Sequence, residues 1–346
     1  MLAMVGERLD LEMAYAGAAG KPGHGPGPSS SLAPGAREQL EFAQGIQRHF
    51  GATLSAIYEL GLFGSLPDEA AWYASTLAWH GLSPDAVRRM IEAWSIAVYS
   101  TIKPPESDQL VAPIKWIRLN LERLTERTQE TDTAKTQELE TLVGLVVGKR
   151  RREAAEYLLG LAHRGRSLGD IHSQLVAPAL REIGLLWQRH KITAADEHAA
   201  TEICRYVLFR LLDDVPREPR LPYTALVAAV TGEEHAFGAE ILAGYLDLKG
   251  WNTVFLGRSA PAEDIVEAAR STGCQVAFLS VALLANLPAA GSLAADLKNL
   301  ATHPKVIIGG RAAGLAADAL ARFSDAVVGS IEDAHAEALR MVASHA

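Results

Sequence analysis

Cysteine is scarce in this chain, and long apolar runs are missing. Only two cysteines occur among the 346 residues, Cys204 and Cys274, each within an apolar periodic segment. Two such thiols form neither a disulfide framework nor a cysteine-based metal cage, and they suit a reducing compartment. No stretch has the roughly 20 apolar residues that a membrane helix needs, and Glu7, Arg8 and Asp10 interrupt any secretory pattern. We therefore expect a cytoplasmic protein without membrane contact.

An excess of positive charge is also missing. The chain has 33 Lys and Arg residues against 41 Asp and Glu residues, which gives a net charge of −8. This balance argues against a nucleic-acid surface that covers the whole molecule. The basic run 149–152 precedes a helical segment with Glu153 and Glu156, so a solvated helix start explains it more simply than a nucleic-acid contact. We expect no direct nucleic-acid partner.

The N-terminal third divides into a leader and a helical domain. Gly, Pro, Ser and Ala dominate residues 17–35, and such a composition buries too little apolar area to offset chain entropy. We interpret residues 1–35 as a flexible leader. Residues 36–124 show helical periodicity and many aromatic side chains, with Ser83 as an expected N-cap and Pro84 at the first helical position.

A second helical region follows the polar stretch 125–135, which we interpret as a linker or as a solvated helix end. Residues 136–215 contain four stretches with a helical apolar period. They cover residues 136–147, 152–164, 168–188 and 194–213. Four such helices predict an antiparallel bundle.

The pattern changes after the proline-rich connector 216–222. Short β-rich apolar runs then alternate with helical segments through residues 222–346. The expected strands are 224–230, 252–256, 276–281, 305–308 and 326–328. The expected helices are 236–249, 261–271, 288–300, 312–322 and 332–343. Five strands with helical crossovers predict a parallel, doubly wound sheet whose ligands bind at the carboxyl ends of the strands.

The loop after the first of these strands contains an imidazole and a carboxylate at the expected ligand edge. Imidazole is a good ligand for a borderline transition metal, so His235 is a candidate metal ligand. Glu233 is placed to accept the other ring N–H. Gly238 opens the next helix without a Cβ, which lets a large ligand approach the backbone. A helix cap or an ordinary loop hydrogen bond is the alternative role for His235.

Small residues follow two further strands at the same edge. Ser280 ends the third strand and Leu283 comes shortly after it, while Gly309 and Gly310 end the fourth strand and Gly314 follows. Because these strand ends converge, a flat group could enter between strands and helices. The double glycine alone would suit many phosphate binders.

Together these residues resemble the cobalamin-binding domain shared by methionine synthase, B12-dependent mutases, corrinoid proteins and B12 photoreceptors. The family's Asp-x-His-x-x-Gly loop is matched by Glu233, His235 and Gly238. The resemblance implies that His235 is the lower cobalt ligand and that Ser280 contacts the displaced benzimidazole. It also implies that the glycine pair 309–310 lines the nucleotide tail. Glu in place of Asp departs from the enzymes and is similar to the photoreceptor branch.

A second motif lies in the four-helix region, where Trp187 is followed after nine residues by Glu197 and His198. A core tryptophan beside a surface Glu-His pair is the alternative interpretation. The spacing is similar to the Trp-x9-Glu-His signature of light-sensing B12 regulators of the CarH kind. That resemblance implies that Trp187 covers a 5′-deoxyadenosyl group, that Glu197 hydrogen-bonds it and that His198 lines the pocket. In some relatives a histidine directly after this tryptophan ligates cobalt after illumination, and Gln188 takes its place here. The second cobalt ligand of any photoproduct would then come from His190, His198 or water.

The N-terminal domain departs from those regulators, which usually begin with a DNA-binding helix-turn-helix. Residues 36–124 show neither a recognition helix nor a basic face. Residues 72–84 resemble instead the helical domain of photocobilins, which hold a bilin beside the corrin. Aromatic side chains and His80 could sandwich a tetrapyrrole, and an aromatic core without a ligand is the alternative.

The resemblance thus implies a light sensor with adenosylcobalamin, and with biliverdin as a second chromophore. The cofactor would lie between a four-helix cap, 136–215, and a flavodoxin-like (Rossmann-like) five-stranded domain, 222–346. No output enzyme domain is recognisable, so we expect no enzymatic activity. The signal would leave through changed association of a homo-oligomer or with an unidentified protein partner. The alternatives are a corrinoid methyl carrier of a methyltransferase system and a B12-responsive antirepressor.

Overall fold

The computed structural model describes residues 36–130 and 136–343. The predicted leader, 1–35, lies outside the described residues. By its contacts the chain divides into two compact units, Met1–Thr133 with Gln188–His190, and Ala134–Trp187 with Lys191–Ala346. Within the described part, every helix is too short or too polar to cross a membrane.

The described part of the first unit is helical. Its elements are α2 (Ala36–Leu60), η1 (Phe63–Ser65), α3 (Leu66–Trp79), α4 (Pro84–Thr101), α5 (Glu106–Leu119) and α6 (Leu121–Glu130). Ser83 caps α4 as expected, because its side chain accepts a hydrogen bond from the backbone N–H of Ala86 at 3.2 Å. The polar stretch that begins at residue 125 is helical as far as Glu130.

The second unit begins with the four-helix region. Its elements are α7 (Gln137–Val147), α8 (Arg151–His163), α9 (Leu168–Ile171), η2 (His172–Val176), α10 (Ala177–Gln188) and α11 (Ala194–Asp214). These elements correspond to the four predicted stretches, because α9, η2 and α10 form one continuous run. Thr193 and Asp196 cap α11 reciprocally, each side chain bonding the other residue's backbone N–H.

The run from α9 to α10 contains a wider turn. In η2 the backbone adopts π-helical geometry, and the N–H of Ala177 donates to the carbonyl of His172, five residues earlier. A proline at position 178 would clash with the carbonyl of Gln174 in a regular α-helix. We attribute the π turn to Pro178, since the extra residue widens the helix where that clash would occur.

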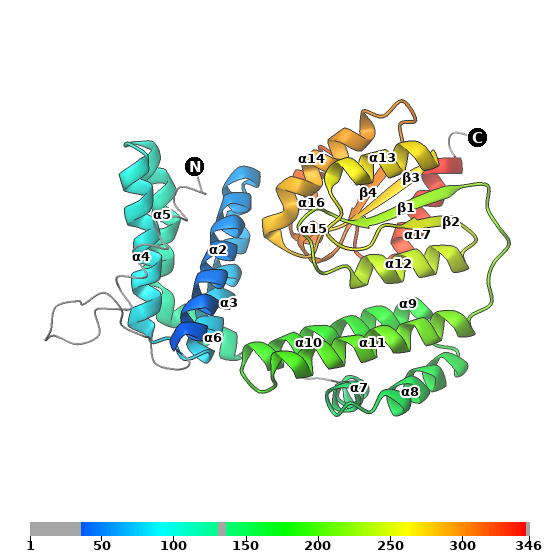
Figure 1. Cartoon of the computed structure of the whole chain (residues 1–346), viewed down its shortest axis with the longest axis horizontal. Helices are drawn as coiled ribbons and strands as arrows, with labels where there is room; N and C mark the ends of the chain where they lie inside the picture. Colours follow the sequence, from blue (N-terminus) through cyan, green and yellow to red (C-terminus); the bar gives the residue numbers. More distant parts are fainter. Residues whose placement is uncertain (1–35, 131–135, 344–346) are drawn as a thin grey trace, which may run out of the picture. The chain divides into compact units, whose positions relative to one another are not determined.

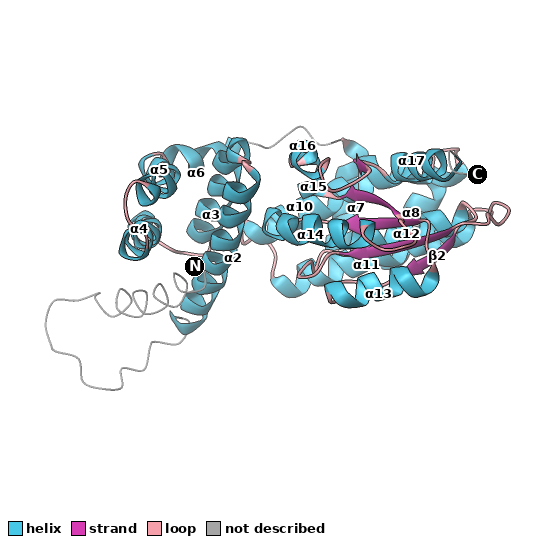
Figure 2. Ribbon diagram, turned by 90° about the horizontal axis from the view of Figure 1, so that it is seen from above, coloured by secondary structure: helices cyan, strands magenta, loops and turns pink. Residues whose placement is uncertain are grey.

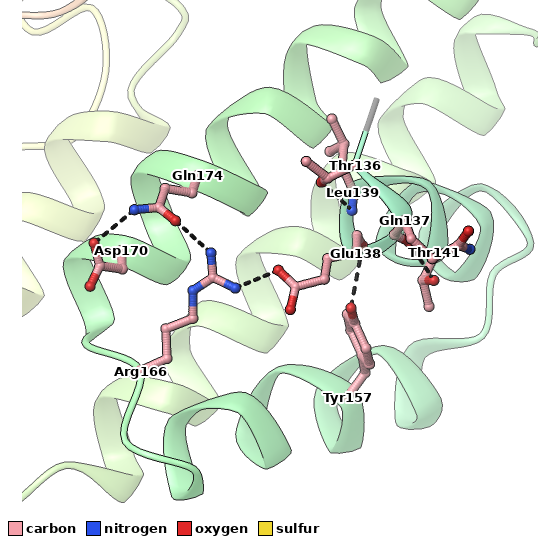
Figure 3. A network of polar contacts seen from close by, with 9 residues as sticks. All are labelled: Thr136, Gln137, Glu138, Leu139, Thr141, Tyr157, Arg166, Asp170 and Gln174. Atoms are coloured by element: carbon pink, nitrogen blue, oxygen red, sulfur yellow. Dashed lines mark hydrogen bonds and ion pairs between the residues drawn. The ribbon is translucent and has the colours of Figure 1, made fainter. Parts of the chain in front are cut away.

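A polar network ties the beginning of this region together (Figure 3). Arg166, in the loop between α8 and α9, donates hydrogen bonds to Glu138 on α7 and to Gln174 on η2. The Gln174 amide in turn donates to Asp170 at 2.9 Å. From α8, the Tyr157 hydroxyl donates to the backbone carbonyl of Glu138 at 3.4 Å. Arg166 therefore links α7 to η2 from the loop between α8 and α9.

The remaining residues form a five-stranded parallel sheet with helices between the strands (Figures 1 and 2). The strand order is β2-β1-β3-β4-β5. The strands are β1 (Thr224–Ala229), β2 (Asn252–Phe255), β3 (Val276–Ser280), β4 (Lys305–Gly309) and β5 (Ala326–Val328). The helices are α12 (Phe237–Leu248), α13 (Ala262–Thr272), η3 (Leu284–Asn286), α14 (Leu287–Lys298), α15 (Arg311–Leu315), α16 (Ala317–Leu320) and α17 (Ile331–Ala343). The predicted fold class is confirmed.

One predicted helix is wrong in detail. The single helix expected over 312–322 is split into α15 and α16, because the backbone of Ala316 leaves helical geometry at φ −120° and ψ 21°. No proline or glycine marks this break at position 316. The other predicted strands and crossover helices are present, with ends that differ by at most two residues.

The core of the sheet is covered on both faces, as a parallel sheet requires. Helices α12 and α17 pack on one face against Val227, Phe278 and Ile307, while α13 and α14 contact the other face. The four-helix region shares its own core with this domain, because Ile241 of α12 and Ile331 of α17 belong to the same buried cluster as its leucines. The four-helix region is therefore packed against α12 and α17 through buried apolar side chains.

Candidate cofactor site

The loop between β1 and α12 is organised around a buried carboxylate. The Glu233 side chain is 0% exposed, and its Oε1 atom accepts hydrogen bonds from the backbone N–H and Nδ1 of His235, at 3.0 and 2.7 Å. Its Oε2 atom accepts from the N–H groups of Ala282 and Leu283 and from the side-chain amide of Asn286, at 2.9, 3.1 and 2.9 Å. Burial alone would raise the pKa of Glu233, but these hydrogen bonds outweigh it and hold the pKa at about 2.

This arrangement determines which ring nitrogen of His235 is available. An ionised carboxylate only accepts, so Nδ1 bears the proton shared with Glu233 and Nε2 keeps its lone pair. The His235 side chain is 62% exposed. The hydrogen bond to Glu233 raises the pKa of His235, burial opposes it, and the charges of Arg311 and Glu197 lower and raise it respectively.

The donor set fits a metal that arrives inside a macrocycle. No group of three or more His, Cys, Asp or Glu side chains that could hold a bare metal ion occurs among residues 36–130 and 136–343. A single exposed imidazole whose Nδ1 is engaged can supply one protein ligand through Nε2 to a metal whose ring donors come from a macrocycle. His235 meets that requirement.

The strand ends beside this loop are shaped by small residues. Ser280 of β3 lies opposite Gly309 of β4 in the sheet register. Gly310 has φ +105°, and a Cβ there would lie 2.4 Å from the carbonyl oxygen of Val281. A side chain is thus excluded at this position. Gly238 and Gly314 face open space instead, so their lack of a Cβ leaves room without being required by packing.

The predicted cap residues lie at the facing ends of α10 and α11. Trp187 is half-buried, one residue before the end of α10. Glu197 accepts a hydrogen bond from the hydroxyl of Thr201 at 3.0 Å and pairs with the His198 ring at 2.5 Å. The His198 side chain is 79% exposed. Of these residues, Glu197 has a charge that contributes to the raised pKa of His235.

The residues that follow Trp187 are engaged in the first unit. Gln188 is 1% exposed, and its amide donates to the Thr76 hydroxyl at 2.7 Å and to the Trp72 carbonyl at 3.3 Å. His190 lies edge-on to His80, with ring centroids 5.1 Å apart. Gln188 is therefore committed to structural hydrogen bonds.

Sequence reasoning missed Asn286. Its side-chain amide donates to Oε2 of Glu233 and, at 3.3 Å, to the carbonyl of Gly232, so it closes the loop from the β3 side. A single polar residue in the apolar run 281–289 is the signal that could have found it. Leu283 acts in this site through its backbone N–H.

The aromatic-rich first unit has a small internal cavity of about 30 Å³, lined by Gln47, Tyr73 and Trp94 among others. That volume is room for about two water molecules. The Gln47 amide nitrogen and the Trp94 indole nitrogen are buried without hydrogen-bond partners. His80 stacks on Phe42 with centroids 4.2 Å apart. This cavity would have to open to admit a tetrapyrrole.

Comparison with known families agrees with the cofactor chemistry of the site. Residues 223–339 match a family model described as a B12 binding domain, and residues 139–212 match a second one. The α/β domain and the four-helix region are thus B12-binding domains, and the chain is a cobalamin-binding protein.

Individual relatives and solved structures are similar to parts of the chain. The HTH-type transcriptional repressor CarA of Myxococcus xanthus is 34% identical over 85 residues, which are 25% of this chain and 27% of that protein. The match thus spans about a quarter of the relative. The monomethylamine corrinoid protein of Methanosarcina barkeri has a TM-score of 0.49 and 18% identity, over 60% of this chain and 100% of that chain. A cobalamin-binding protein of Desulfitobacterium hafniense DCB-2 has a TM-score of 0.32 and 19% identity, over 58% and 97%.

Proposed function

We propose that this protein is a light sensor that holds adenosylcobalamin between His235 and the cap residues Trp187 and Glu197. The observation that carries the proposal is the pairing of His235 with the buried Glu233, which engages Nδ1 and leaves Nε2 for a metal. The bound cofactor would supply a photolabile cobalt–carbon bond. His235, Glu233 and Glu197 would hold and orient it.

The chemistry of the cap favours an adenosyl group over a methyl group on the upper side. An ionised carboxylate such as Glu197 accepts hydrogen bonds from hydroxyl groups, which a ribose offers and a methyl group does not. A half-buried tryptophan can cover the flat face of a purine. A cap with these contacts distinguishes the alkylated from the photolysed cofactor, as a switch requires.

The proposed cap favours a sensor over a methyl carrier. A carrier must expose the upper face of its corrinoid to a methyltransferase, whereas Trp187 and Glu197 would cover that face in the proposed arrangement. We propose that the signal leaves through changed association of a homo-oligomer or of an unidentified protein partner, without enzymatic activity. The similarity to CarA supports a regulatory role, and a B12-responsive antirepressor is the second candidate. The free, buried Cys204 and Cys274 fit a cytoplasmic location.

Biliverdin as a second chromophore is proposed on the aromatic side chains of the first unit alone. The cavity found there is much smaller than a bilin, so binding would require the helices to repack. An absorption band from added biliverdin that survives gel filtration would support this part of the proposal. The absence of that band would rule out the biliverdin part of the proposal and would leave the cobalamin site unaffected.

The decisive experiment is an absorption spectrum of the full chain, loaded in darkness with adenosylcobalamin and biliverdin and passed through gel filtration before and after green light. We expect a retained corrinoid spectrum that changes with light, together with a changed elution volume. Elution without a corrinoid spectrum would overturn cobalamin binding. If the protein retains the corrinoid but shows no light-dependent change in size or partner binding, the methyl-carrier alternative would be favoured.

Two variants assign the roles of the site residues. His235→Ala should abolish tight retention of the corrinoid, whereas His163→Ala, on the exposed end of α8, should retain it. Trp187→Ala should keep the corrinoid and lose the light-dependent change in elution. An unaltered photoresponse of Trp187→Ala would contradict the cap assignment.

A further inference from the structure

One face of α11 runs from the candidate cofactor site to helix α12. Glu197, Thr201 and Arg205 follow one another at intervals of four residues, which places them on the same side of the helix. The Thr201 hydroxyl bonds Glu197 at one end. At the other end, Nε of Arg205 donates to Oε2 of Glu240 on α12 at 2.8 Å. The cap helix that carries Glu197 is therefore bonded to the helix that follows the His235 loop.

Arg205 is held by more than one contact. Its guanidinium also pairs with Glu202, one turn earlier on α11, and lies over the ring of Phe237 at 5.8 Å from the centroid. The side chains of Arg205 and Glu240 are only 25% and 23% exposed. Partly buried networks with an aromatic contact stabilise more than isolated surface pairs do.

The residues that Arg205 contacts are close to the candidate cobalt ligand in the chain. Phe237 is the first residue of α12 and comes two residues after His235. Further along the same pair of helices the backbones approach closely, because a Cβ on Gly244 would lie 2.6 Å from a methyl carbon of Leu212. The seam between α11 and α12 is thus fixed by packing at Gly244 and by a polar network at Arg205.

We propose that Arg205 is a positioning residue that sets the separation between Glu197 and His235, by tying α11 to Glu240 and Phe237 of α12. This inference rests on the proposed function, since it assumes that a corrinoid occupies the space between those two residues. Without the Arg205 network, α11 would pivot about the contact of Leu212 with Gly244. The end of α11 that bears Glu197 would then move away from the His235 loop.

The proposal predicts a selective defect. A corrinoid with an adenosyl group reaches the cap, whereas hydroxocobalamin presents only a small group on its upper side. Loosening α11 should therefore weaken adenosylcobalamin and leave hydroxocobalamin nearly unchanged. A purely structural role for Arg205 would weaken both corrinoids alike, because both need the same folded α/β domain.

The test is a titration of the full chain with each corrinoid in darkness, followed by absorption. For Arg205→Ala we expect the dissociation constant of adenosylcobalamin to rise about 2- to 30-fold, with a smaller change for hydroxocobalamin. Glu240→Ala should reproduce this selectivity, and the double variant should lose no more than either single one, since both remove the same link. Arg340→Ala is the matched control, because its pairing with Glu337 lies within α17 alone and Arg340 is 67% exposed.

Hydrogen exchange of the free protein gives a second readout. Arg205→Ala should speed amide exchange in the first turns of α11 and not in β1 or β3, if the helix pivots as proposed. Equal weakening of both corrinoids, or unchanged affinity for adenosylcobalamin, would overturn the assignment of Arg205 while leaving the cofactor site intact. Failure of the unmodified chain to bind either corrinoid would instead overturn the proposed function and this inference with it.

Discussion

Oε1 of Glu233 lies 2.7 Å from Nδ1 of His235, while the other oxygen of the same carboxylate holds the loop after β3. One fully buried side chain thus orients the candidate cobalt ligand and joins two strand ends that meet at the edge of the sheet. The orientation of the imidazole is therefore built into the folded domain.

Glu233→Gln should destabilise the protein although it preserves the size of the side chain. An amide nitrogen cannot accept, so at least one of the donors now bonded to Glu233 is left buried and unsatisfied. We expect the free energy of unfolding to fall by about 1–3 kcal/mol, measured by urea denaturation at neutral pH. Glu234→Gln is the matched control, since Glu234 is exposed, and should change stability by less than about 0.5 kcal/mol. Equal effects of both variants would contradict the role given to Glu233.

Gly310→Ala should be much more damaging than Gly314→Ala. The first substitution places a Cβ against the carbonyl of Val281 and keeps φ at +105°, whereas the second points into open space within α15. We expect Gly310→Ala to lose about 1–3 kcal/mol of stability and Gly314→Ala to lose nothing or to gain slightly. Thermal unfolding of the two variants checks this, and similar melting temperatures would refute the requirement for glycine at position 310.

The strands and the motif residues could be predicted from the sequence, whereas most of their contact partners could not. Parallel strands are buried on both faces, so runs such as 224–229 and 276–280 are almost continuously apolar and easy to place. The contact between Glu233 and His235 is local and was predictable from spacing. Asn286 and the pair Arg205 with Glu240 were not, because their contacts span about 35 to 53 positions. The apolar periodicity of a sequence identifies one helix at a time and does not predict how α11 packs against α12.

His335 should make stability depend on pH. Trp251 is completely buried, and its indole N–H donates to Nδ1 of His335 at 3.1 Å, which requires that nitrogen to be unprotonated. Burial lowers the pKa of His335, and the charge of Lys249 adds to this effect. A histidine whose folded pKa is depressed contributes stability above its unfolded pKa of about 6.5, and that contribution is lost as the pH falls through the folded value.

We therefore expect the melting temperature to decrease as the pH is lowered below about 6.5. His335→Asn should flatten this dependence, since its side-chain oxygen can accept from Trp251 and does not titrate. The melting temperatures of the two proteins across this pH range provide the measurement. Parallel curves would show that other groups cause the decline.

The two cysteines should be unreactive in the folded protein. Burial raises the pKa of Cys204 to about 12 and that of Cys274 to about 11, and the thiolate is the reactive form. An aromatic disulfide reagent at about pH 8 should label neither thiol in the native state and both in urea. Cys274→Ser should remove half of the signal in urea. Rapid labelling without denaturant would contradict the burial of these side chains.

The π turn at His172–Val176 changes the direction in which the side chains after it project from the helix. Each extra residue rotates an α-helix by about 100°. A helical wheel drawn straight from Ser167 to Trp187 would therefore assign the tryptophan to the wrong side of the cylinder. A graft that smoothed Pro178 and its turn into regular helix would keep every residue of the motif and aim its indole elsewhere.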